Sequence, residues 1–170
     1  YRDAPIERML EGWERGDRLT VVAVPEGPVI APVLGYLRAT GPAAGRAFRR
    51  GALEVRVVPF VAQPRYDELL WACGCNFVRG EDSFVRAQWA ARPLVWQIYP
   101  QQERAHWRKL EAFLDLYCDG LPTAAVAAQR GMWRAWNSVG DSPAQLSEAW
   151  RAFRAQRTVL ETHARAWTMR

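Results

Sequence analysis

Short apolar runs alternate with helical patterns along roughly the first hundred residues. The continuous apolar run at residues 19–24 predicts a buried parallel strand, and further strands are predicted at residues 53–60, 75–78 and 93–98. The segments around these runs carry apolar residues at helical spacing. They predict helices at residues 5–15, after residue 28 to about 39, at 64–72, and from Ser83 onward. Strands that alternate with helices in this way favour a doubly wound parallel sheet.

After the fourth strand the pattern becomes helical throughout. It predicts helices at residues 103–118, 123–137 and 142–168. In the last of these, a packing stripe recurs at spacings of 3, 4 or 7: Leu146, Trp150, Phe153, Leu160 and Trp167. A chain of 170 residues suits one domain with a real core. We therefore expect one Rossmann-like α/β domain over 1–170, with its core at about 1–117 and C-terminal helices at 118–170.

The positive charge of the chain changes this picture little. A net charge of +5 invites a nucleic-acid interpretation, but the basic residues are scattered among 18 acids. Lys109 is the only lysine among the 23 basic residues, and Arg49 and Arg50 form the only adjacent arginine pair. The arginines are therefore interpreted as solvated surface, and no nucleic-acid partner is expected.

Several classes of protein are disfavoured by missing patterns. No apolar run reaches the roughly 18 residues that a membrane span needs, and the N-terminus has no signal-peptide pattern. Cys73, Cys75 and Cys118 form no C-x-x-C pair, which favours a reducing cytoplasm. The chain has no G-x-G-x-x-G, P-loop or D-x-D motif, so no dinucleotide or ATPase site is expected. It starts at Tyr1 without an initiator Met, and we expect it to be a piece of a longer protein.

The segment that follows the third predicted strand is the main candidate site. It contains Arg79, Gly80, Glu81, Asp82 and Ser83, and it leads into a helix. Ligand sites of open α/β sheets lie at such strand ends, where the free N–H groups of the next helix face the ligand. The Arg79 guanidinium suits phosphate oxygens, the two acids suit sugar hydroxyls, and Ser83 is a natural N-cap. The alternative is a capped helix with an ordinary surface ion pair.

Loops after the neighbouring strands add aromatic and amide groups. A base would stack on Phe60 or Tyr66 while Gln63 reads its edge, and Tyr99 follows the last strand. Aromatic residues at strand and helix ends also serve as core, so this pattern alone leaves both roles open. Gln97 is predicted to lie on the surface of the sheet.

Three motifs carry a resemblance to a known family. They are LLWAC at residues 69–73, NFVRGEDSFVRAQW at 76–89 and PLVWQIYPQ at 93–101. This sequence resembles the bacterial protein-arginine rhamnosyltransferase family EarP, which modifies translation elongation factor P. The resemblance covers the chain from about Tyr1 to the C-terminus. One departure is Gly74-Cys75, where the family usually has an Asp followed by an apolar residue.

The resemblance implies the C-terminal, donor-binding half of a GT-B glycosyltransferase, with the N-terminal GT-B domain absent. The donor would be dTDP-β-L-rhamnose, and the acceptor an arginine of elongation factor P. Transfer would invert the sugar configuration and need no metal or other cofactor. This chain alone would be inactive, because the principal base belongs to the N-terminal domain. The alternatives are a GT-B domain for another nucleotide sugar and a non-catalytic module that binds nucleotides or nucleic acid.

The resemblance also implies roles for individual residues. Phe60, Gln63 and Tyr66 would hold the thymine and deoxyribose, with Tyr1 beside them. Arg79 and Ser83 would bind the pyrophosphate, and Tyr99 is a weaker candidate for a phosphate contact. Glu81 and Asp82 would contact the rhamnose, and Glu81 would assist catalysis.

Overall fold

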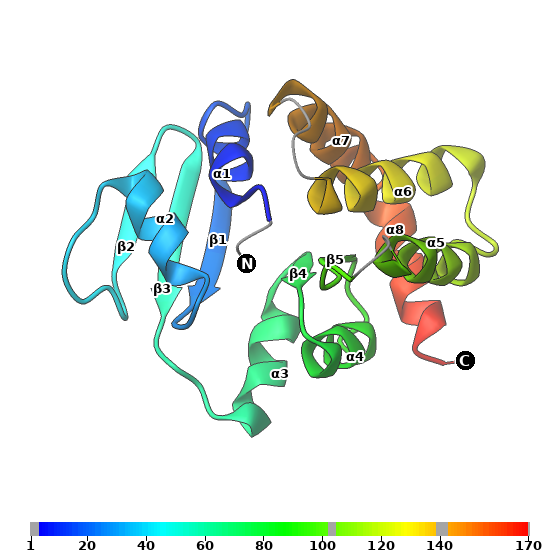
Figure 1. The fold of residues 1–170 in the computed structure, drawn as a ribbon, viewed down its shortest axis with the longest axis horizontal. Helices are drawn as coiled ribbons and strands as arrows, with labels where there is room; N and C mark the ends of the chain where they lie inside the picture. The colour runs from blue at the N-terminus through cyan, green and yellow to red at the C-terminus, as the bar shows by residue number, and fades with distance from the viewer. Residues whose placement is uncertain (1–3, 102–104, 139–142, 170) are drawn as a thin grey trace.

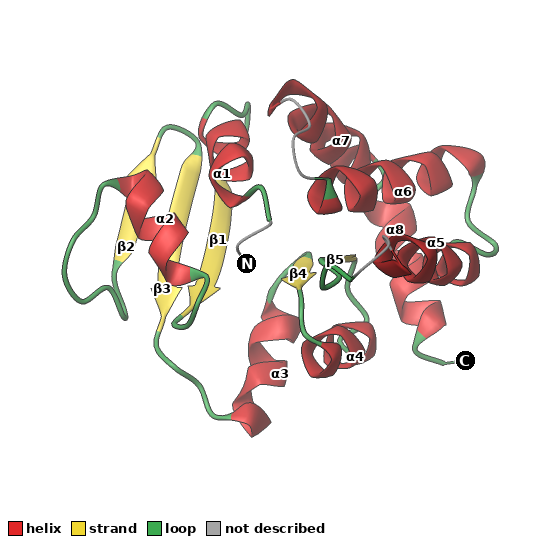
Figure 2. Cartoon of the chain, viewed as in Figure 1, coloured by secondary structure: helices red, strands yellow, loops and turns green. Residues whose placement is uncertain are grey.

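The computed structural model describes residues 4–101, 105–138 and 143–169 (Figures 1 and 2). The first elements are α1 (Ile6–Glu14), β1 (Thr20–Pro25), α2 (Ile30–Leu37), β2 (Ala47–Arg50) and β3 (Leu53–Val58). The middle of the chain forms α3 (Gln63–Ala72), β4 (Asn76–Val78), α4 (Glu81–Trp89) and β5 (Leu94–Trp96). The last elements are α5 (Ala105–Tyr117), α6 (Thr123–Asn137), α7 (Pro143–Ala155) and α8 (Arg157–Trp167).

The four strands expected from apolar runs are present and pair in parallel. β1 pairs with β3 and β4 pairs with β5, within two separately hydrogen-bonded sheets of order β1-β3-β2 and β4-β5. β2 was not predicted. It is an antiparallel edge strand, joined to β3 by a turn in which Gly51 has φ of 53°. It has only four residues, two of them arginines, so the sequence shows no apolar pattern there.

Two helix predictions need correction. α4 begins at Glu81 rather than Ser83, because Gly80 takes the extended N-cap conformation (φ −65°, ψ 160°). The single helix expected at 142–168 is two helices, since Gln156 leaves the helical region with φ −92° and ψ 11°. The Gln156 N–H donates to the Phe153 carbonyl, a bond three residues back that tightens the chain there. The apolar stripe continues across this break.

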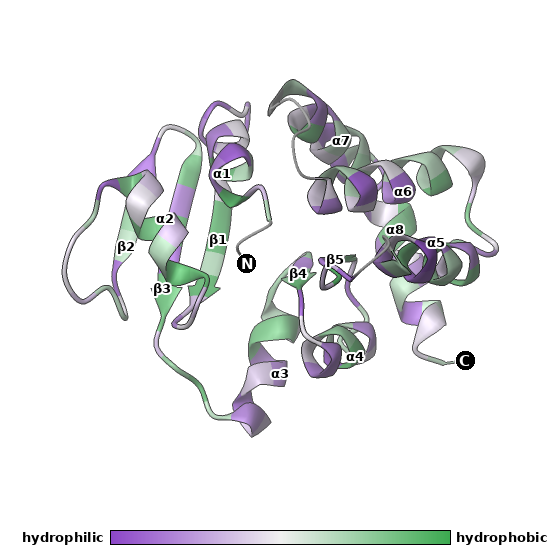
Figure 3. Cartoon of the chain, viewed as in Figure 1, coloured by the Kyte–Doolittle hydropathy of each residue, from purple (hydrophilic) through white to green (hydrophobic). Residues whose placement is uncertain are grey.

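Aromatic side chains hold the second sheet to the C-terminal helices. Trp133 of α6 is fully buried, and its Nε1 donates to the Leu94 carbonyl at 2.7 Å. Its ring stacks on Phe113 of α5 with centroids 5.7 Å apart. Trp96 of β5 stacks on Phe84 of α4 at 4.0 Å. The helices of this region are amphipathic (Figure 3), and their buried aromatic rings support the strand end that carries the candidate site.

The first sheet meets the rest of the molecule through α1, which lies beside α7 (Figure 1). The Trp13 ring contacts the edges of Phe77 in β4 and Trp150 in α7, at centroid distances of 5.8 and 5.4 Å. A Cβ at Gly12 would lie only 2.7 Å from the Ser147 hydroxyl oxygen. Glycine therefore allows α1 to approach α7 closely, and this contact places the loops of the first sheet relative to those of the second.

Glu111 on α5 is predicted to make stability depend on pH. It accepts hydrogen bonds from Arg134 at 2.7 and 2.8 Å and from Arg130 at 3.1 Å. The Arg134 hydrogen bond is the main cause that lowers the pKa of this carboxyl below its ordinary 4.5. The stabilisation is therefore present above pH 4.5 and is lost as the pH falls through the lowered pKa.

Glu111→Gln should lower the free energy of unfolding in urea by about 1 kcal/mol at pH 7. The difference from the unchanged chain should shrink below pH 4.5 as the carboxylate becomes protonated. Glu148→Gln is the control, since Glu148 makes no ion pair with a described residue and should change stability little. A Glu111→Gln effect that persists undiminished at low pH would contradict the assignment.

Candidate functional site

The loops after β4 and β5 converge on Arg79. Its guanidinium carbon lies 4.7 Å from the centroid of the Tyr99 ring. Its carbonyl accepts a hydrogen bond from Trp96 Nε1 at 3.0 Å. Because β4 and β5 are parallel, their carboxyl ends share one edge, which is where the site was predicted. Tyr99 is half exposed, so the Arg79–Tyr99 pair borders solvent.

The N-terminus of α4 lies directly after Arg79. The N-cap residue is Gly80, which offers no side chain to the free N–H groups of the first turn. Ser83 is not the N-cap. Its hydroxyl instead donates back to the Gly80 carbonyl at 3.0 Å. A Cβ at Gly80 would lie 3.6 Å from Ser83 Oγ and 3.9 Å from the Tyr99 hydroxyl, so these groups form one cluster. The helix dipole makes this end of α4 attractive to an anion.

A second cluster joins α3 to α4. Gln63 Nε2 donates to Asp82 Oδ2 at 3.2 Å, so two predicted site residues are in contact. Arg86 Nε donates to the same oxygen at 2.9 Å, and Arg86 Nη1 reaches both Asp67 oxygens at 3.1 and 3.0 Å. Sequence reasoning missed Arg86 and Asp67. The Asp82–Arg86 spacing of i,i+4 on one helix was the available signal.

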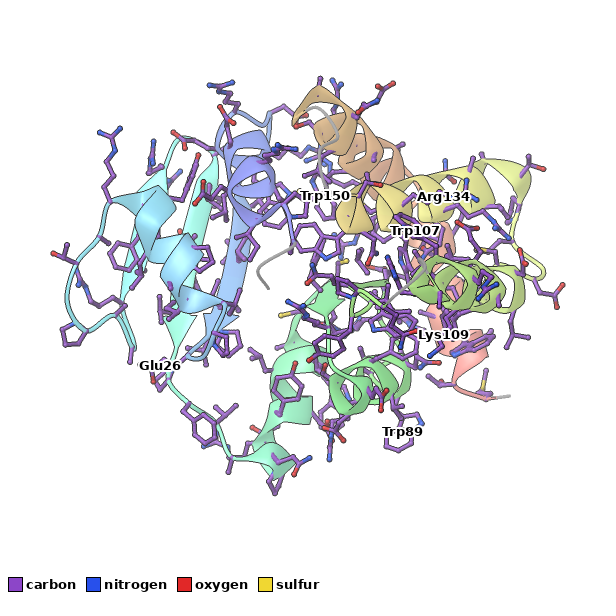
Figure 4. The ribbon with its side chains drawn as sticks, in the orientation of Figure 1. Glu26, Trp89, Trp107, Lys109, Arg134 and Trp150 are labelled. Carbon is purple, nitrogen blue, oxygen red and sulfur yellow. The ribbon has the colours of Figure 1, made fainter. Side chains whose placement is uncertain are left out.

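The two aromatic candidates differ in exposure. Phe60 lies between β3 and α3 with 80% of its surface exposed, whereas Tyr66 is partly buried against the core. The Phe60 N–H donates to Glu26 Oε2 at 3.1 Å. Glu26, in the loop after β1, lies near the start of the segment that leads to α3 (Figure 4). The sequence marked that loop as a strand end but did not single out Glu26.

The sequence also singled out Glu81, Tyr1 and Gln97. Glu81 is exposed in the first turn of α4, where its charge favours the helix N-terminus. Tyr1 lies outside the described residues. Gln97, which was expected on the sheet surface, is buried because it follows β5 into the interior, where its N–H donates to the Val78 carbonyl.

The surrounding chemistry is simple. In the described ranges, no group of three or more His, Cys, Asp or Glu side chains is placed to hold a metal ion. Within the same ranges no helix is both long and apolar enough to cross a membrane. Cys73, Cys75 and Cys118 are free thiols, and burial raises the pKa of each. They are therefore protonated at neutral pH and poor nucleophiles.

Comparison with known proteins identifies the family. The model of the family described as Elongation-Factor P (EF-P) rhamnosyltransferase EarP matches residues 1–170. The chain belongs to the EarP family. The family resemblance expected from the sequence motifs is thereby confirmed over the whole chain.

Individual relatives agree with the family match. The chain is 46% identical over 170 residues to the protein-arginine rhamnosyltransferase of Pseudomonas putida KT2440, and covers 44% of it. It is 46% identical over 167 residues to that of Pseudomonas aeruginosa PAO1, of which it covers 43%. The chain therefore spans less than half the length of these curated relatives.

A solved structure supports the fold. It is described as the structural basis for EarP-mediated arginine glycosylation of translation elongation factor EF-P. It matches with a TM-score of 0.85 and 43% identity, over 98% of this chain and 52% of its own. The predicted α/β fold is confirmed. The predicted domain division and the roles of the site residues stay predictions.

Proposed function

We propose that this chain is the donor-binding half of an inverting glycosyltransferase. The enzyme would move L-rhamnose from dTDP-β-L-rhamnose to an arginine side chain of elongation factor P. The observation that carries this proposal is the position of Arg79, beside Tyr99 and directly before the uncapped N-terminus of α4. It occurs in a chain that matches the EarP family over its full length.

Each part of the donor would meet a different part of the site. The pyrophosphate would lie against Arg79, Ser83 and the first turn of α4, with Tyr99 at its border. The thymine and deoxyribose would lie toward Phe60, Gln63 and Tyr66. Phe60, with most of its ring exposed, offers a face on which a base can stack. Glu81 and Asp82, at the start of α4, would face the rhamnose hydroxyls.

The reaction needs stabilisation of the departing diphosphate and a base for the acceptor. A guanidinium and a helix N-terminus supply positive potential where negative charge develops, so this chain would serve the leaving group without a metal ion. The attacking arginine nitrogen must lose a proton to a carboxylate. We place the principal base outside this chain, in the part of the longer relatives that it does not cover, and assign Glu81 an assisting role. The chain alone would then bind donor without transferring rhamnose.

This proposal defines the partners and the location. The donor nucleotide and elongation factor P are the proposed partners, with neither nucleic acid nor membrane among them. Because elongation factor P serves translation, we propose a cytoplasmic location.

Calorimetric titration of the full chain with nucleotides tests the proposal. We expect dTDP and dTDP-rhamnose to bind, and binding to survive removal of divalent ions with EDTA. UDP should bind about tenfold more weakly, because it lacks the methyl group of thymine and adds a ribose 2′-hydroxyl. Equal affinity for UDP would point to a different nucleotide sugar. Binding of a short oligonucleotide in place of dTDP would point to a nucleic-acid module.

A further inference from the structure

We propose that Arg86 is a positioning residue that sets base selectivity. It acts through Asp82 to fix the orientation of the Gln63 carboxamide, so that the amide oxygen is presented to a nucleobase carrying an imide N–H. This inference rests on the proposed donor site. It concerns a residue that contacts neither sugar nor phosphate in that proposal.

Arg86 joins two carboxylates from two helices. Its side chain is 20% exposed, and its Nε donates to Asp82 on α4 while Nη1 donates to both oxygens of Asp67 on α3. The hydrogen bonds from Arg86 to Asp67, and then to Asp82, raise the pKa of the guanidinium, so it stays charged. Asp82 is 66% exposed, and its hydrogen bond with Arg86 therefore fixes the position of its carboxylate.

Asp82 in turn determines which way the Gln63 amide points. An ionised carboxylate only accepts hydrogen bonds, so the NH2 group of Gln63, and not its oxygen, must face Asp82 Oδ2. The chemistry of the partner therefore assigns the amide orientation, which distances alone do not. Gln63 Oε1 is left facing away from Asp82 as a hydrogen-bond acceptor.

An acceptor oxygen held in this way discriminates between pyrimidines. Thymine presents an N3–H donor on its pairing edge, whereas the N3 of cytosine presents a lone pair. An oxygen opposite N3 attracts the first and repels the second, so cytosine would bring two acceptors face to face where thymine makes a hydrogen bond. If Arg86 is removed, Asp82 loses its cation and is free to rotate. Gln63 can then turn its NH2 group toward the base and accept cytosine.

Asp82 keeps a role toward the sugar in this arrangement. Gln63 and Arg86 both donate to Oδ2, and no hydrogen bond from a described residue involves Oδ1, which is available to a sugar hydroxyl. One carboxylate can therefore link the selection of the base to the position of the sugar.

The test compares the dissociation constants of dTDP and dCDP in the full chain. The unchanged chain should bind dTDP about tenfold or more tightly than dCDP, and Arg86→Ala should reduce that ratio to within about threefold. Arg86→Lys keeps the charge but not the planar fork, and should give an intermediate ratio. Arg65→Ala is the matched control, because Arg65 makes an exposed pair with Glu68 on α3, 3.4 Å apart, and should leave the ratio unchanged.

A second comparison separates positioning from simple support of the fold. In a Gln63→Ala background, Arg86→Ala should change the ratio no further, because residues that act as a unit are not additive. Asp82→Asn keeps the size of the side chain but lets either end of the Gln63 amide face it, so it should also lower the ratio. Asp82→Asn thus tests the proposal even where Arg86→Ala unfolds the chain, which thermal melting of each variant would reveal.

The outcomes are distinguishable. An equal loss of dTDP and dCDP affinity in folded Arg86→Ala, with the ratio unchanged, would show that Arg86 only braces α3 against α4 and would overturn the proposal. An unchanged ratio in Asp82→Asn would overturn it as well. Failure of the unchanged chain to bind either nucleotide would overturn the proposed function itself, and this inference with it.

Discussion

Arg79→Ala is expected to weaken dTDP binding by tenfold or more. Hydrogen bonds from a charged donor contribute about 1.5–3 kcal/mol, and loss of the guanidinium also removes its contact with the Tyr99 ring. Calorimetric titration of the variant against the unchanged chain measures the effect. Arg79→Lys should lie between the two, because lysine keeps the charge without the fork that fits two phosphate oxygens.

Arg108→Ala on α5 controls for the loss of one positive charge. Arg108 is exposed and makes no ion pair with a described residue, so its removal should leave dTDP affinity within about twofold. An Arg79→Ala variant that melts normally and binds dTDP as tightly as the unchanged chain would contradict the site assignment.

Trp133→Ala is expected to cause the largest loss of stability, about 3–5 kcal/mol. The substitution empties a fully buried position and leaves the Leu94 carbonyl without its indole donor. Urea unfolding monitored by far-UV circular dichroism measures the change. Because the rings of Phe113 and Trp96 lie against Trp133, the variant should also loosen the support of the strand end before Tyr99.

Trp89→Ala is the matched control for this prediction. Trp89 projects from α4 with 70% of its surface exposed (Figure 4), so its removal should change stability by no more than about 0.5 kcal/mol. If Trp133→Ala lowers the free energy of unfolding no more than Trp89→Ala does, the aromatic cluster does not stabilise the core.

The strands that the sequence predicted well are those whose apolar residues are buried, such as β3, where Leu53, Val55 and Val57 face the interior. Burial is a property that hydrophobic pattern reports directly. β2 was not predicted because its stability comes from pairing with β3, and such pairing does not require an apolar run in the sequence. The break between α7 and α8 at Gln156 was not predicted because the helical spacing of apolar residues continues through it.

The sequence predicted the part of the candidate site whose residues directly follow the ends of strands. Arg79, Ser83 and Tyr99 do come together, since the loops of adjacent parallel strands must meet. Arg86 was missed because its importance depends on Asp67, which lies 19 residues earlier on another helix. Glu26 was missed for the same reason: its partner, the Phe60 N–H, is 34 residues away. Contacts between residues distant in sequence, such as these two, have no local signature.

The division of the strands between two sheets has a consequence for affinity. Glu26 and Phe60 follow strands of the first sheet, whereas Arg79 and Tyr99 follow strands of the second. A nucleotide that touches both groups would act as a non-covalent cross-link. Its measured affinity would then depend on the fraction of molecules in which α1 is docked on α7, because only those molecules present both groups to the nucleotide. Gly12 lies on α1 and not in the loops of the candidate site. It would nevertheless influence donor binding, because its close approach to Ser147 favours the docked arrangement of α1 and α7.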